Sequence, residues 1–508
     1  MVVMDSTKTK YDDGKRIKIK DENRKESWFC TYNLLSVTLI AFGISSLLFL
    51  PDYIHKQMMF NLELRPDSRT FSEWKKPTVP LYLDIYIFNW TNPDDIKNTS
   101  TKPILHQLGP YRFRDYPDKH NITFHENSTV SYRKSNIYYF VPDMSNGTLD
   151  DVIVGVNLLA LGAGHSSRYW GGLKQYGVST SLNTFGQKIH VVKSAREMLF
   201  EGFEDPLMTI GSWFSTDAAD FDRVGYMVKK NASDRMTGKY TVHTGVGNIS
   251  ELGKIKKFND KSYFPHFQGE CRKLKGSPGE FYPPERKNKE DTMFLFTPEM
   301  CKSLPYEYDY DKSIHGLKGS RYSLGQRAVD NGSTYSENKC YFEYEIPSGV
   351  WNMSACAFNN PFFISYPHFY MADQSYIDAV EGLAPQKELH ESYMTLDETL
   401  SITLETAARF QTNVLLEPFG SISLFKNVPK ILMPLFFVEQ KFIIGESDAS
   451  QLYYGLLIFN LSKYAGFVLI FLGAFLIACR RLKCCNKEPI IEKNPPEACA
   501  LVSKENTV

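Results

Sequence analysis

The sequence has no excess of charge of either sign, because 58 lysine and arginine residues balance 58 aspartate and glutamate residues. Proteins that act mainly on nucleic acid carry a basic surface that neutralises phosphates, so this balance argues against a nucleic-acid partner. Apolar and charged fractions of 43% and 23% are ordinary for a folded protein, which excludes a disordered or collagen-like chain. The 508 residues are therefore expected to fold.

The sequence also lacks the short motifs of catalytic centres. Residues 164–168 (GHSSR) resemble a nucleophile elbow, but that turn needs glycine two residues after its serine, where Arg168 stands. His390-Glu391 has no second histidine at zinc-binding spacing, and no Gly-Lys-Ser/Thr loop is present to hold a phosphate. We therefore expect no enzyme activity, no cofactor and no metal site, and we interpret isolated histidines as structural residues.

Two segments are free of charge. Residues 28–50 contain no charged side chain, and at about 1.5 Å per residue a helix of this length crosses the roughly 30 Å hydrocarbon layer. Residues 464–479 are equally uncharged but short, so the second span is predicted over residues 455–479, with Lys463 reaching toward the headgroups. A cleaved signal peptide is the alternative for the first span, but the length of its apolar run favours an uncleaved anchor.

Basic residues flank both spans on the sides of the chain termini. They are Lys18, Lys20, Arg24 and Lys25 before the first span and Arg480, Arg481, Lys483 and Lys487 after the second. Cationic flanks stay in the cytoplasm, so both termini are predicted to be cytoplasmic. The predicted order is a tail over 1–27, a span over 28–50, an ectodomain over 51–454, a span over 455–479 and a tail over 480–508.

The predicted location is the plasma membrane, with an endosomal or lysosomal membrane as the alternative. Ile490 and Ile491 resemble a dileucine sorting signal only weakly, because Asn486 replaces the usual acidic residue.

Acceptors for N-linked sugar support this topology, because all ten lie between the tails and none lies in either tail. One such tripeptide is a weak signal, whereas ten on one side are hard to ascribe to chance. The predicted glycosylation sites are Asn89, Asn98, Asn121, Asn127, Asn146, Asn231, Asn248, Asn331 and Asn352. The tenth acceptor, Asn460, lies too close to the predicted bilayer to be modified.

Cysteine usage agrees with an oxidising compartment for the ectodomain. Its cysteines are Cys271, Cys301, Cys340 and Cys356. An even number within a short stretch predicts two disulfides, whose pairing the sequence alone does not choose, and buried free thiols are the alternative. The predicted lipidation sites, at the cytoplasmic membrane face, are Cys30, Cys479, Cys484 and Cys485. Reduced thiols are the alternative there.

The ectodomain alternates as strands do. In residues 81–88 every second side chain is aliphatic, and residues 111–114 and 240–243 alternate similarly. Gly109-Pro110 is a turn signal. Residues 193–203 and 399–410 place apolar residues at intervals of three and four, which predicts helices. The expected fold is α+β with an antiparallel sheet.

Several blocks in a fixed order resemble one family over nearly the whole chain. They are residues 87–93 (IFNWTNP), 108–111 (LGPY), 281–284 (FYPP), 296–301 (FTPEMC), 366–369 (YPHF), 382–385 (GLAP) and 409–413 (RFQTN). With these blocks the sequence resembles the class B scavenger receptors, a family that includes fatty-acid translocase, the high-density-lipoprotein receptor, lysosomal integral membrane protein and sensory neuron membrane proteins.

The resemblance implies an antiparallel β-barrel ectodomain, a helical cap at its membrane-distal apex and an apolar tunnel leading toward the bilayer. Such a tunnel suits lipophilic cargo, because each methylene kept out of water is worth about 0.8 kcal/mol. The resemblance also implies the disulfides Cys271–Cys340 and Cys301–Cys356. Many members have a further cysteine pair, but Tyr341-Phe342 stand where one of its cysteines often lies, so other contacts must hold that region.

Family members carry basic residues on the cap that meet anionic ligands, and the corresponding region here runs from about residue 151 to about residue 205. The ligand-binding candidates are Lys174, Lys188, Lys193 and Arg196. An ordinary ion pair of Lys193 with Glu197 is the alternative interpretation. These residues do not match the family's fatty-acid-contacting lysines position by position, which leaves the cargo open.

The implied function is that of a scavenger-type lipid receptor and transporter, which takes fatty acid, sterol, carotenoid or lipoprotein lipid at the apex and delivers it to the membrane. The alternative is a surface or lysosomal receptor that binds protein, lipoprotein particles or apoptotic cells without lipid transfer. A two-span ligand-gated channel shares the topology, but it would not carry the ordered blocks. The expected partners are membrane lipids, lipophilic small molecules or lipoprotein particles, and homo-oligomerisation is left open.

Overall fold

The computed structural model describes residues 7–77, 79–98, 100–208, 223–228, 230–231, 238–284, 286, 288–342, 346–357 and 360–485. Within these ranges, side chains are described from residue 33 to residue 482, except residue 480. The chain forms two compact units. We call Met58–Tyr453 the barrel unit, and Met1–Gln57 together with Tyr454–Val508 the helix unit.

Two long helices dominate the ends of the chain. Helix α1 spans Thr7–Leu62 and helix α9 spans Glu446–Cys485. The segments Asn33–Leu62 and Glu446–Cys479 are long and apolar enough to cross a membrane, with mean hydropathies of 2.1 and 2.0, and few of their residues are buried. Helix α1 continues past Leu50 through Pro51, so the helix is longer than the span expected from the sequence.

Glycines bring the two helices of the helix unit close together. A Cβ atom added at Gly43 would lie 2.8 Å from the Gly466 carbonyl oxygen, and one added at Gly473 would lie 2.9 Å from the Ser36 carbonyl oxygen. Ser36 and Ser462 are buried. Small residues let membrane helices contact through their backbones, so this seam explains how the two predicted spans pair.

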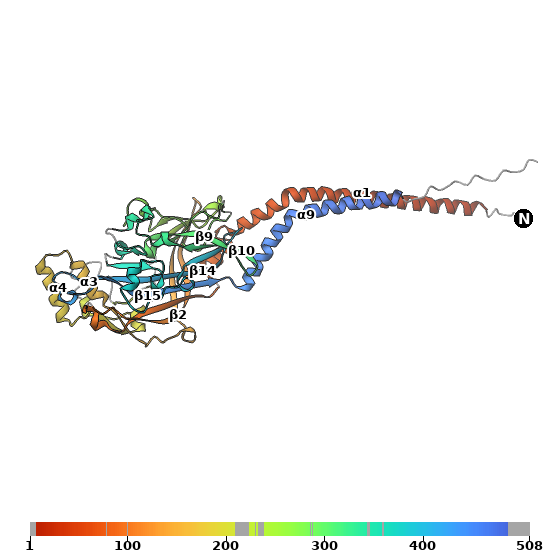
Figure 1. Cartoon of the computed structure of the whole chain (residues 1–508). Coiled ribbons are helices and arrows are strands. Elements are labelled where there is room, and N and C mark those ends of the chain that lie inside the picture. Colours follow the sequence, from red (N-terminus) through yellow and green to blue (C-terminus); the bar gives the residue numbers. More distant parts are fainter. Residues whose placement is uncertain are drawn as a thin grey trace, which may run out of the picture. The chain divides into compact units, whose positions relative to one another are not determined.

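The barrel unit is built on one antiparallel sheet of 13 strands, which Figure 1 shows. The main path runs β7-β6-β3-β2-β1-β15-β14-β13-β10-β9-β8, and β12, which carries β11, pairs with β14. The bounds are β1 Leu81–Trp90, β2 Leu105–His125, β3 Thr129–Phe140, β6 Lys239–His243, β7 Ile255–Phe258, β8 Met293–Thr297, β9 Lys302–Ile314, β10 Leu317–Leu324, β11 Val350–Asn352, β12 Phe362–Ser365, β13 Tyr393–Asp397, β14 Thr403–Leu416 and β15 Ile431–Ile443. The strands predicted over residues 81–88, 111–114 and 240–243 are confirmed.

The segment at Gly276 and Ser277 links the two ends of the sheet. The Ile255 amide of β7 donates to the Gly276 carbonyl (2.8 Å), and the Phe296 amide of β8 donates to the Ser277 carbonyl (2.7 Å). Gly276 has a φ of +80°, and a Cβ there would lie 1.8 Å from the Phe294 carbonyl oxygen, so only glycine fits. The sheet is therefore a nearly closed barrel, and the α+β barrel fold is confirmed.

Helices gather at one end of the barrel unit. Helices α3 (Leu158–Ser167) and α4 (Gly172–Thr184), with the short turn η11 (Ser423–Phe425), form what we call the cap. A two-stranded sheet of β4 (Val152–Val156) and β5 (His190–Ser194) connects the cap to the barrel. The other short helices are α2 (Arg69–Lys75), α6 (Gln326–Val329), α7 (Gln374–Asp378) and α8 (Lys387–His390).

The cap lies at the end of the barrel unit toward which β1 runs. Near the end of β1, Asn89 accepts a hydrogen bond from the Val154 amide of β4 (2.8 Å), and the Trp90 ring lies 6.4 Å from the His190 ring of β5. Strand β15 follows η11 and runs antiparallel to β1, away from the cap. Strand β15 therefore ends at the end of the barrel unit opposite the cap.

Three sequence-based predictions of secondary structure need correction. Residues 399–410 were expected to be helical, but strand β14 begins at Thr403 and is buried on both faces, so apolar residues on both sides imitate a helical period. Only residues 195–201 of the helix expected over 193–203 are helical, because β5 extends to Ser194. Gly109 lies inside β2, beside a register shift, instead of in a turn.

Candidate functional site

Apolar packing and a few hydroxyl contacts seat the cap on the barrel. A Cβ added at Gly164 of α3 would lie 2.5 Å from the Phe419 ring and 3.2 Å from the Phe425 ring, so only glycine allows this close approach. The Ser179 hydroxyl of α4 accepts a hydrogen bond from the Ser423 amide at 3.0 Å. Asn157 caps α3 by accepting from the Ala160 amide, a contact that favours helix initiation there.

Gln175 fixes the turn between α3 and α4. Its buried side-chain amide donates to the carbonyl oxygens of Ser167 (3.2 Å) and Arg168 (3.0 Å). These hydrogen bonds satisfy two carbonyl oxygens at the end of α3 from the side that faces the protein. The residues that follow lie on the solvent side. A Cβ at Gly171 or Gly172 would meet nothing within 4 Å, so the turn faces open space.

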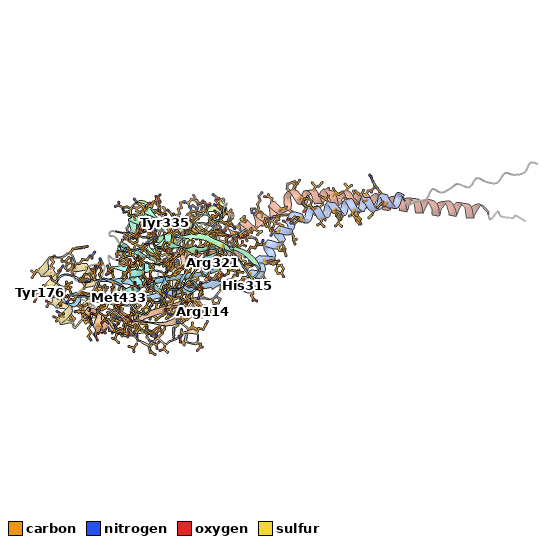
Figure 2. All side chains as sticks on the ribbon, in the orientation of Figure 1. Arg114, Tyr176, His315, Arg321, Tyr335 and Met433 are labelled. Atoms are coloured by element: carbon orange, nitrogen blue, oxygen red, sulfur yellow. A yellow bond between two sulfur atoms is a disulfide. The ribbon has the colours of Figure 1, made fainter. Side chains whose placement is uncertain are left out.

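The outer surface of the cap is apolar. Tyr169 is 86% exposed, Leu173 is 86% exposed and Tyr176 is 67% exposed, while the side of α4 that faces the protein carries Gln175 and Ser179. Figure 2 shows Tyr176 at the cap, at the opposite end of the barrel unit from His315. We call Tyr169, Leu173 and Tyr176 the cap triad. No sequence-based prediction included it, although Leu173 and Tyr176 are three residues apart and would share a helix face.

The segment that carries the cap triad encodes basic residues and no acidic one. No aspartate or glutamate occurs between Asp151 and Glu197, although the whole chain is neutral. The Arg168 guanidinium lies 4.5 Å from the centre of the Tyr169 ring. No sugar acceptor occurs between Asn146 and Asn231 in the sequence. The helices α3 and α4 therefore carry exposed apolar side chains, basic residues and no sugar acceptor.

Two of the four predicted ligand-binding cations are already paired. Lys193 lies in β5 with its ammonium 3.7 Å from the Glu197 carboxylate, so the ion pair offered as the alternative is present. The Arg196 guanidinium lies 3.2 Å from Asp150 and 3.4 Å from Glu201. These pairs reduce the charge that either side chain offers to a ligand.

The other two candidates, Lys174 and Lys188, are exposed. Lys174 lies in α4 next to Leu173, and Lys188 follows α4.

A surface hollow of about 470 Å³ lies beside Arg196 and is lined by Phe140, Pro142, Ser145, Gly147, Thr148, Leu149 and Asp150. The apolar tunnel remains a prediction that comes with the family resemblance.

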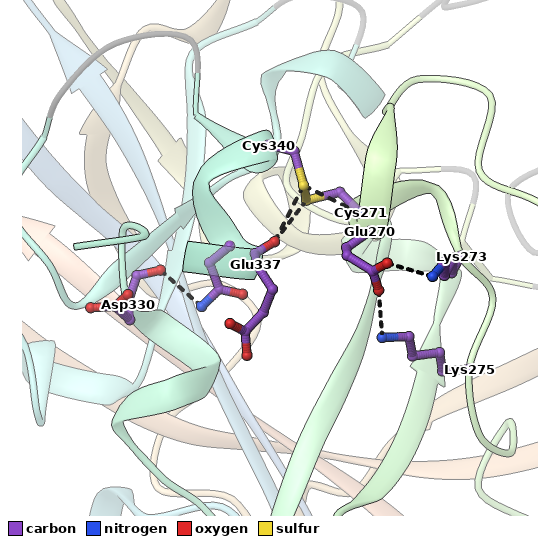
Figure 3. The surroundings of a disulfide bond; sticks show 8 residues. Glu270, Cys271, Lys273, Lys275, Asp330, Glu337 and Cys340 are labelled. Carbon is purple, nitrogen blue, oxygen red and sulfur yellow. Dashed lines mark hydrogen bonds and ion pairs between the residues drawn. A yellow bond between two sulfur atoms is a disulfide. The ribbon is translucent and has the colours of Figure 1, made fainter. Parts of the chain in front are cut away.

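The structure has two disulfides, in the pairing that the resemblance implies. Cys271 is bonded to Cys340 and Cys301 to Cys356. Figure 3 shows the first bond with Glu270 beside it, whose carboxylate is paired with Lys273 and, at 3.4 Å, with Lys275.

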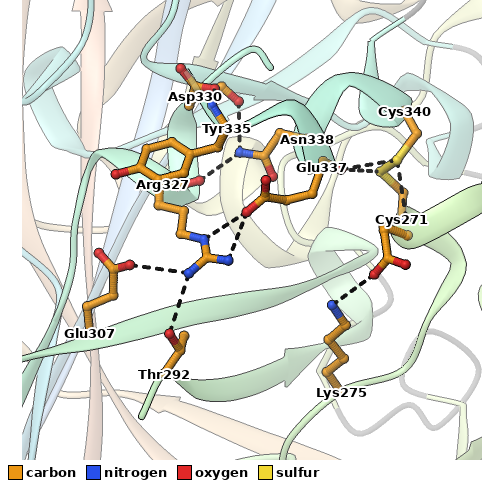
Figure 4. A network of polar contacts seen from close by, with 11 residues as sticks. Cys271, Lys275, Thr292, Glu307, Arg327, Asp330, Tyr335, Glu337, Asn338 and Cys340 are labelled. Carbon is orange, nitrogen blue, oxygen red and sulfur yellow. Dashed lines mark hydrogen bonds and ion pairs between the residues drawn. A yellow bond between two sulfur atoms is a disulfide. The ribbon is translucent and has the colours of Figure 1, made fainter. Parts of the chain in front are cut away.

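A polar network holds the region where a third bridge is missing. Figure 4 shows the Arg327 guanidinium, which lies 2.8 Å from the Glu337 carboxylate and 3.4 Å from Glu307. The Asn338 amide donates to the carbonyl oxygens of Arg327 (2.7 Å) and Asp330 (3.1 Å). These contacts tie α6 to the turn η8 (Ser336–Tyr341), which carries Cys340.

A buried lysine lies between the two disulfides. Lys302 is 2% exposed, and its ammonium donates to the Ala328 carbonyl at 2.8 Å and faces the rings of Tyr341 (4.6 Å) and Trp351 (5.7 Å). Burial lowers the pKa of Lys302 to about 7, although Asp330 raises it in part. No sequence pattern pointed to this residue.

The predicted glycosylation sites differ in exposure. Asn98, Asn121, Asn127, Asn146, Asn231 and Asn248 are exposed, and Asn89 and Asn331 are half-buried. Asn352 is only 8% exposed within β11. A glycan needs open space around the amide nitrogen, so Asn352 is the least accessible of the nine predicted sites. Glycosylation at these positions stays a prediction.

The remaining predictions concern thiols and metals. Cys479 is a free, half-buried cysteine of α9, while the side chains of Cys30, Cys484 and Cys485 lie outside the described residues. In the part of the chain that the structure describes, no three His, Cys, Asp or Glu side chains are grouped to hold a metal ion.

The histidine of the YPHF block is structural. The rings of His368 and His390 stack at 4.5 Å, and their Nδ1 atoms accept hydrogen bonds from the amides of Ala384 (3.1 Å) and Gln386 (2.9 Å). Burial lowers the pKa of His368 to about 4 and that of His390 to about 3, so both rings stay neutral and hold the GLAP block in place.

The fold and the two apolar helices define a membrane-anchored protein with one large β-barrel body. A family model described as CD36 family matches residues 34–483. The chain is 36% identical to Protein peste of Drosophila melanogaster over 424 residues, which cover 82% of this chain and 76% of that protein.

Two mammalian relatives extend the comparison. Identity to scavenger receptor class B member 1 of Mus musculus is 30% over 446 residues, which cover 87% of this chain and 86% of that protein. Identity to lysosome membrane protein 2 of Mus musculus is 27% over 434 residues, which cover 84% and 88%. The chain belongs to the CD36 family, the class B scavenger receptors, and is a membrane protein of receptor type.

Proposed function

We propose that this protein is a lipid receptor and transporter. It takes lipophilic cargo, such as fatty acid, sterol, carotenoid or lipoprotein lipid, at the cap and delivers it to the membrane that holds its two spans. The observation that carries the proposal is the apolar surface of the cap in a chain of the CD36 family, because exposed tyrosine and leucine on a helix are normally covered by a partner.

The proposed topology places the barrel unit outside the cytoplasm and both termini inside. The cationic flanks of the spans and the exposed sugar acceptors support it. Added protease should cut the barrel unit of intact cells, and removal of N-linked sugar should increase its mobility on a gel. A barrel unit that is protected in intact cells would contradict this topology.

Transfer is tested in cells that express the full chain. We expect faster uptake of a labelled fatty acid or sterol ester than in cells without the chain, and we expect the same lipid class to co-purify with the protein and to be identified by mass spectrometry. Unchanged uptake with normal surface expression would reject transport. Binding of lipoprotein particles without uptake would then favour the alternative, a receptor that binds without transfer.

The location is tested with a fluorescently tagged chain. We propose the plasma membrane as the main site. Replacement of Ile490 and Ile491 by alanine should leave the distribution unchanged if these residues carry no sorting signal. A shift from lysosomes to the surface would instead assign them to sorting and the chain to the lysosomal membrane.

A further inference from the structure

Strand β9 carries a run in which tyrosine and acidic residues alternate. Residues 306–311 read Tyr-Glu-Tyr-Asp-Tyr-Asp. The run passes from the core to the surface, because Tyr306 is buried, Tyr308 is half-buried and Tyr310 is 47% exposed. The acidic residues on both sides of Tyr310 are exposed as well. The last tyrosine of the run therefore lies at the surface between two carboxylates.

The sheet leaves this part of β9 accessible. Strand β8 pairs with β9 from Lys302 to Tyr306, and beyond Tyr306 the register of β9 continues with β10. Among the strands that the structure describes, residues 307–314 therefore have a neighbour on one edge. The turn that follows, at His315, lies at the opposite end of the barrel unit from the cap (Figure 2). An enzyme can reach Tyr310 at this open edge without displacing a strand.

The Tyr310 hydroxyl is available to react. It has no hydrogen-bond partner among the described residues, and its ring lies 5.2 Å from the Arg321 guanidinium. Tyr308 differs, because its ring lies 4.8 Å from the Lys289 ammonium and packs against the Tyr322 ring at 6.0 Å. The geometry therefore favours Tyr310 over Tyr308 as a site of chemistry.

The flanking carboxylates remain partly in water. Asp309 pairs with Arg321, and Asp311 lies 2.7 Å from the Lys289 ammonium, but the two acidic side chains are 27% and 47% exposed. Of the exposed tyrosines that the structure describes, Tyr310 alone has an acidic residue on each side. An enzyme that transfers a group from an anionic donor needs a cationic active site, which attracts a tyrosine placed between carboxylates.

We propose that Tyr310 is a site of tyrosine O-sulfation. The phenolic oxygen forms a bond to the sulfur of a phosphosulfate nucleotide, the bond from sulfur to the phosphate oxygen breaks, and the nucleotide leaves with that electron pair. A base of the transferase takes the phenolic proton, and no atom changes its oxidation state. The product adds a negative charge beside Asp309 and Asp311.

The inference goes beyond the proposed handling of lipid. It rests on the proposed topology, because tyrosine is sulfated in the lumen of the secretory pathway and the barrel unit must pass through that lumen. N-linked sugar on the same molecules reports the topology independently of sulfate.

The test uses the full chain in cultured cells that are fed radioactive sulfate. After removal of N-linked sugar, which can itself carry sulfate, we expect label on tyrosine in the wild type and its loss in Tyr310→Phe. This variant removes only a hydroxyl, so glycosylation and surface expression should not change. The matched control is Tyr116→Phe, at a tyrosine that is 45% exposed and follows Arg114 and Asp115. It should keep the label.

Two further measurements locate the group. Trypsin should release residues 303–312, which contain all three tyrosines of the run, and fragmentation in a mass spectrometer should place the added group on Tyr310. Asp311→Asn should lower the label without loss of sugar, because it removes one flanking carboxylate. Chlorate, which blocks synthesis of the phosphosulfate donor, should abolish the label in the wild type.

Four results would reject the inference. They are full label in Tyr310→Phe, loss of label in Tyr308→Phe instead, removal of the added group by a phosphatase, and a wild type without label. In the last case, sugar that a glycosidase removes would leave the topology standing and reject sulfation alone. A chain that carries neither sulfate nor sugar would reject the topology and sulfation together.

Discussion

The cap and the disulfide-linked region at residues 269–356 are built by opposite means. The cap has no cysteine and no acidic residue, it rests on ring packing around Gly164, and the cap triad faces outward. The disulfide-linked region has two covalent bonds, the Arg327 network and a buried lysine. The comparison teaches that covalent bonds and ion pairs hold one region of the barrel unit, whereas apolar packing holds the cap and leaves large apolar side chains exposed on it.

Removal of a disulfide bond should have the largest effect on the free energy of unfolding. Cys301→Ser with Cys356→Ser opens a loop of 55 residues and is expected to lower the free energy of unfolding by about 4 kcal/mol. Thermal unfolding of the purified chain measures this. If the variant unfolded at the wild-type temperature, the disulfide-linked region would depend on its polar network alone, and the comparison would fail.

Lys302 should make the stability of this region depend on pH. Its folded-state pKa of about 7 lies below the unfolded value of about 10.4, so the folded state favours the neutral amine and stability is lost as pH falls from 10.4 through 7. The free energy of unfolding should therefore rise by about 2 kcal/mol between pH 7 and pH 9. Denaturant titrations at both pH values test this.

The variant Lys302→Met should flatten that rise, because it carries no titratable group. Lys318→Met, at an exposed lysine of β10, is the matched control and should keep the wild-type slope. Equal slopes in wild type and Lys302→Met would show that the amine stays charged when the protein is folded.

The polar network that stands in for a third bridge should contribute less. Arg327→Met removes contacts to Glu337 and Glu307, but these side chains are about a third exposed, so water screens them and the expected loss is about 1 kcal/mol. Lys273→Met, at an exposed ion pair with Glu270, should cause no measurable change. A similar loss in both variants would mean that the network is an ordinary surface feature.

The smallest effect on stability should come from the cap surface. Leu173→Ser removes a side chain that is almost fully exposed, so the free energy of unfolding should stay within about 0.5 kcal/mol of wild type. Leu182→Ser, on the buried side of α4, should unfold the cap and provides the contrast. A large destabilisation by Leu173→Ser would mean that the residue supports the cap itself.

Much of the fold could be read from the sequence because local periodicity reflects burial on one face. Residues 81–88 alternate and form β1, which lies in the middle of the sheet path. The same reasoning failed for residues 399–410, because β14 is buried on both faces and its apolar residues no longer alternate. The turn predicted at Gly109 was also wrong, because a glycine with positive φ occurs at an irregularity within a strand as well as in a turn.

The candidate site was harder to predict. The basic residues of the cap region and the pair of Lys193 with Glu197 were visible in the sequence, but the pairing of Arg196 depends on Asp150 and Glu201, which the fold brings beside it. Lys302 was invisible as a buried amine, because an isolated lysine in a sequence is normally exposed. In both cases the missing information was which side chains surround the charge.

By itself the sequence determined the two apolar segments, the confinement of sugar acceptors between the tails, the family and the absence of acidic residues from the cap. These features depend only on which residues occur in which order along the chain. Only the tertiary structure decided that Gly276 and Ser277 link the sheet ends, that Asn352 is buried and that the cap triad faces outward. The physical reason is that exposure and closure are properties of contacts between distant residues, and one helix face can point to water or to a core until its neighbours are in place.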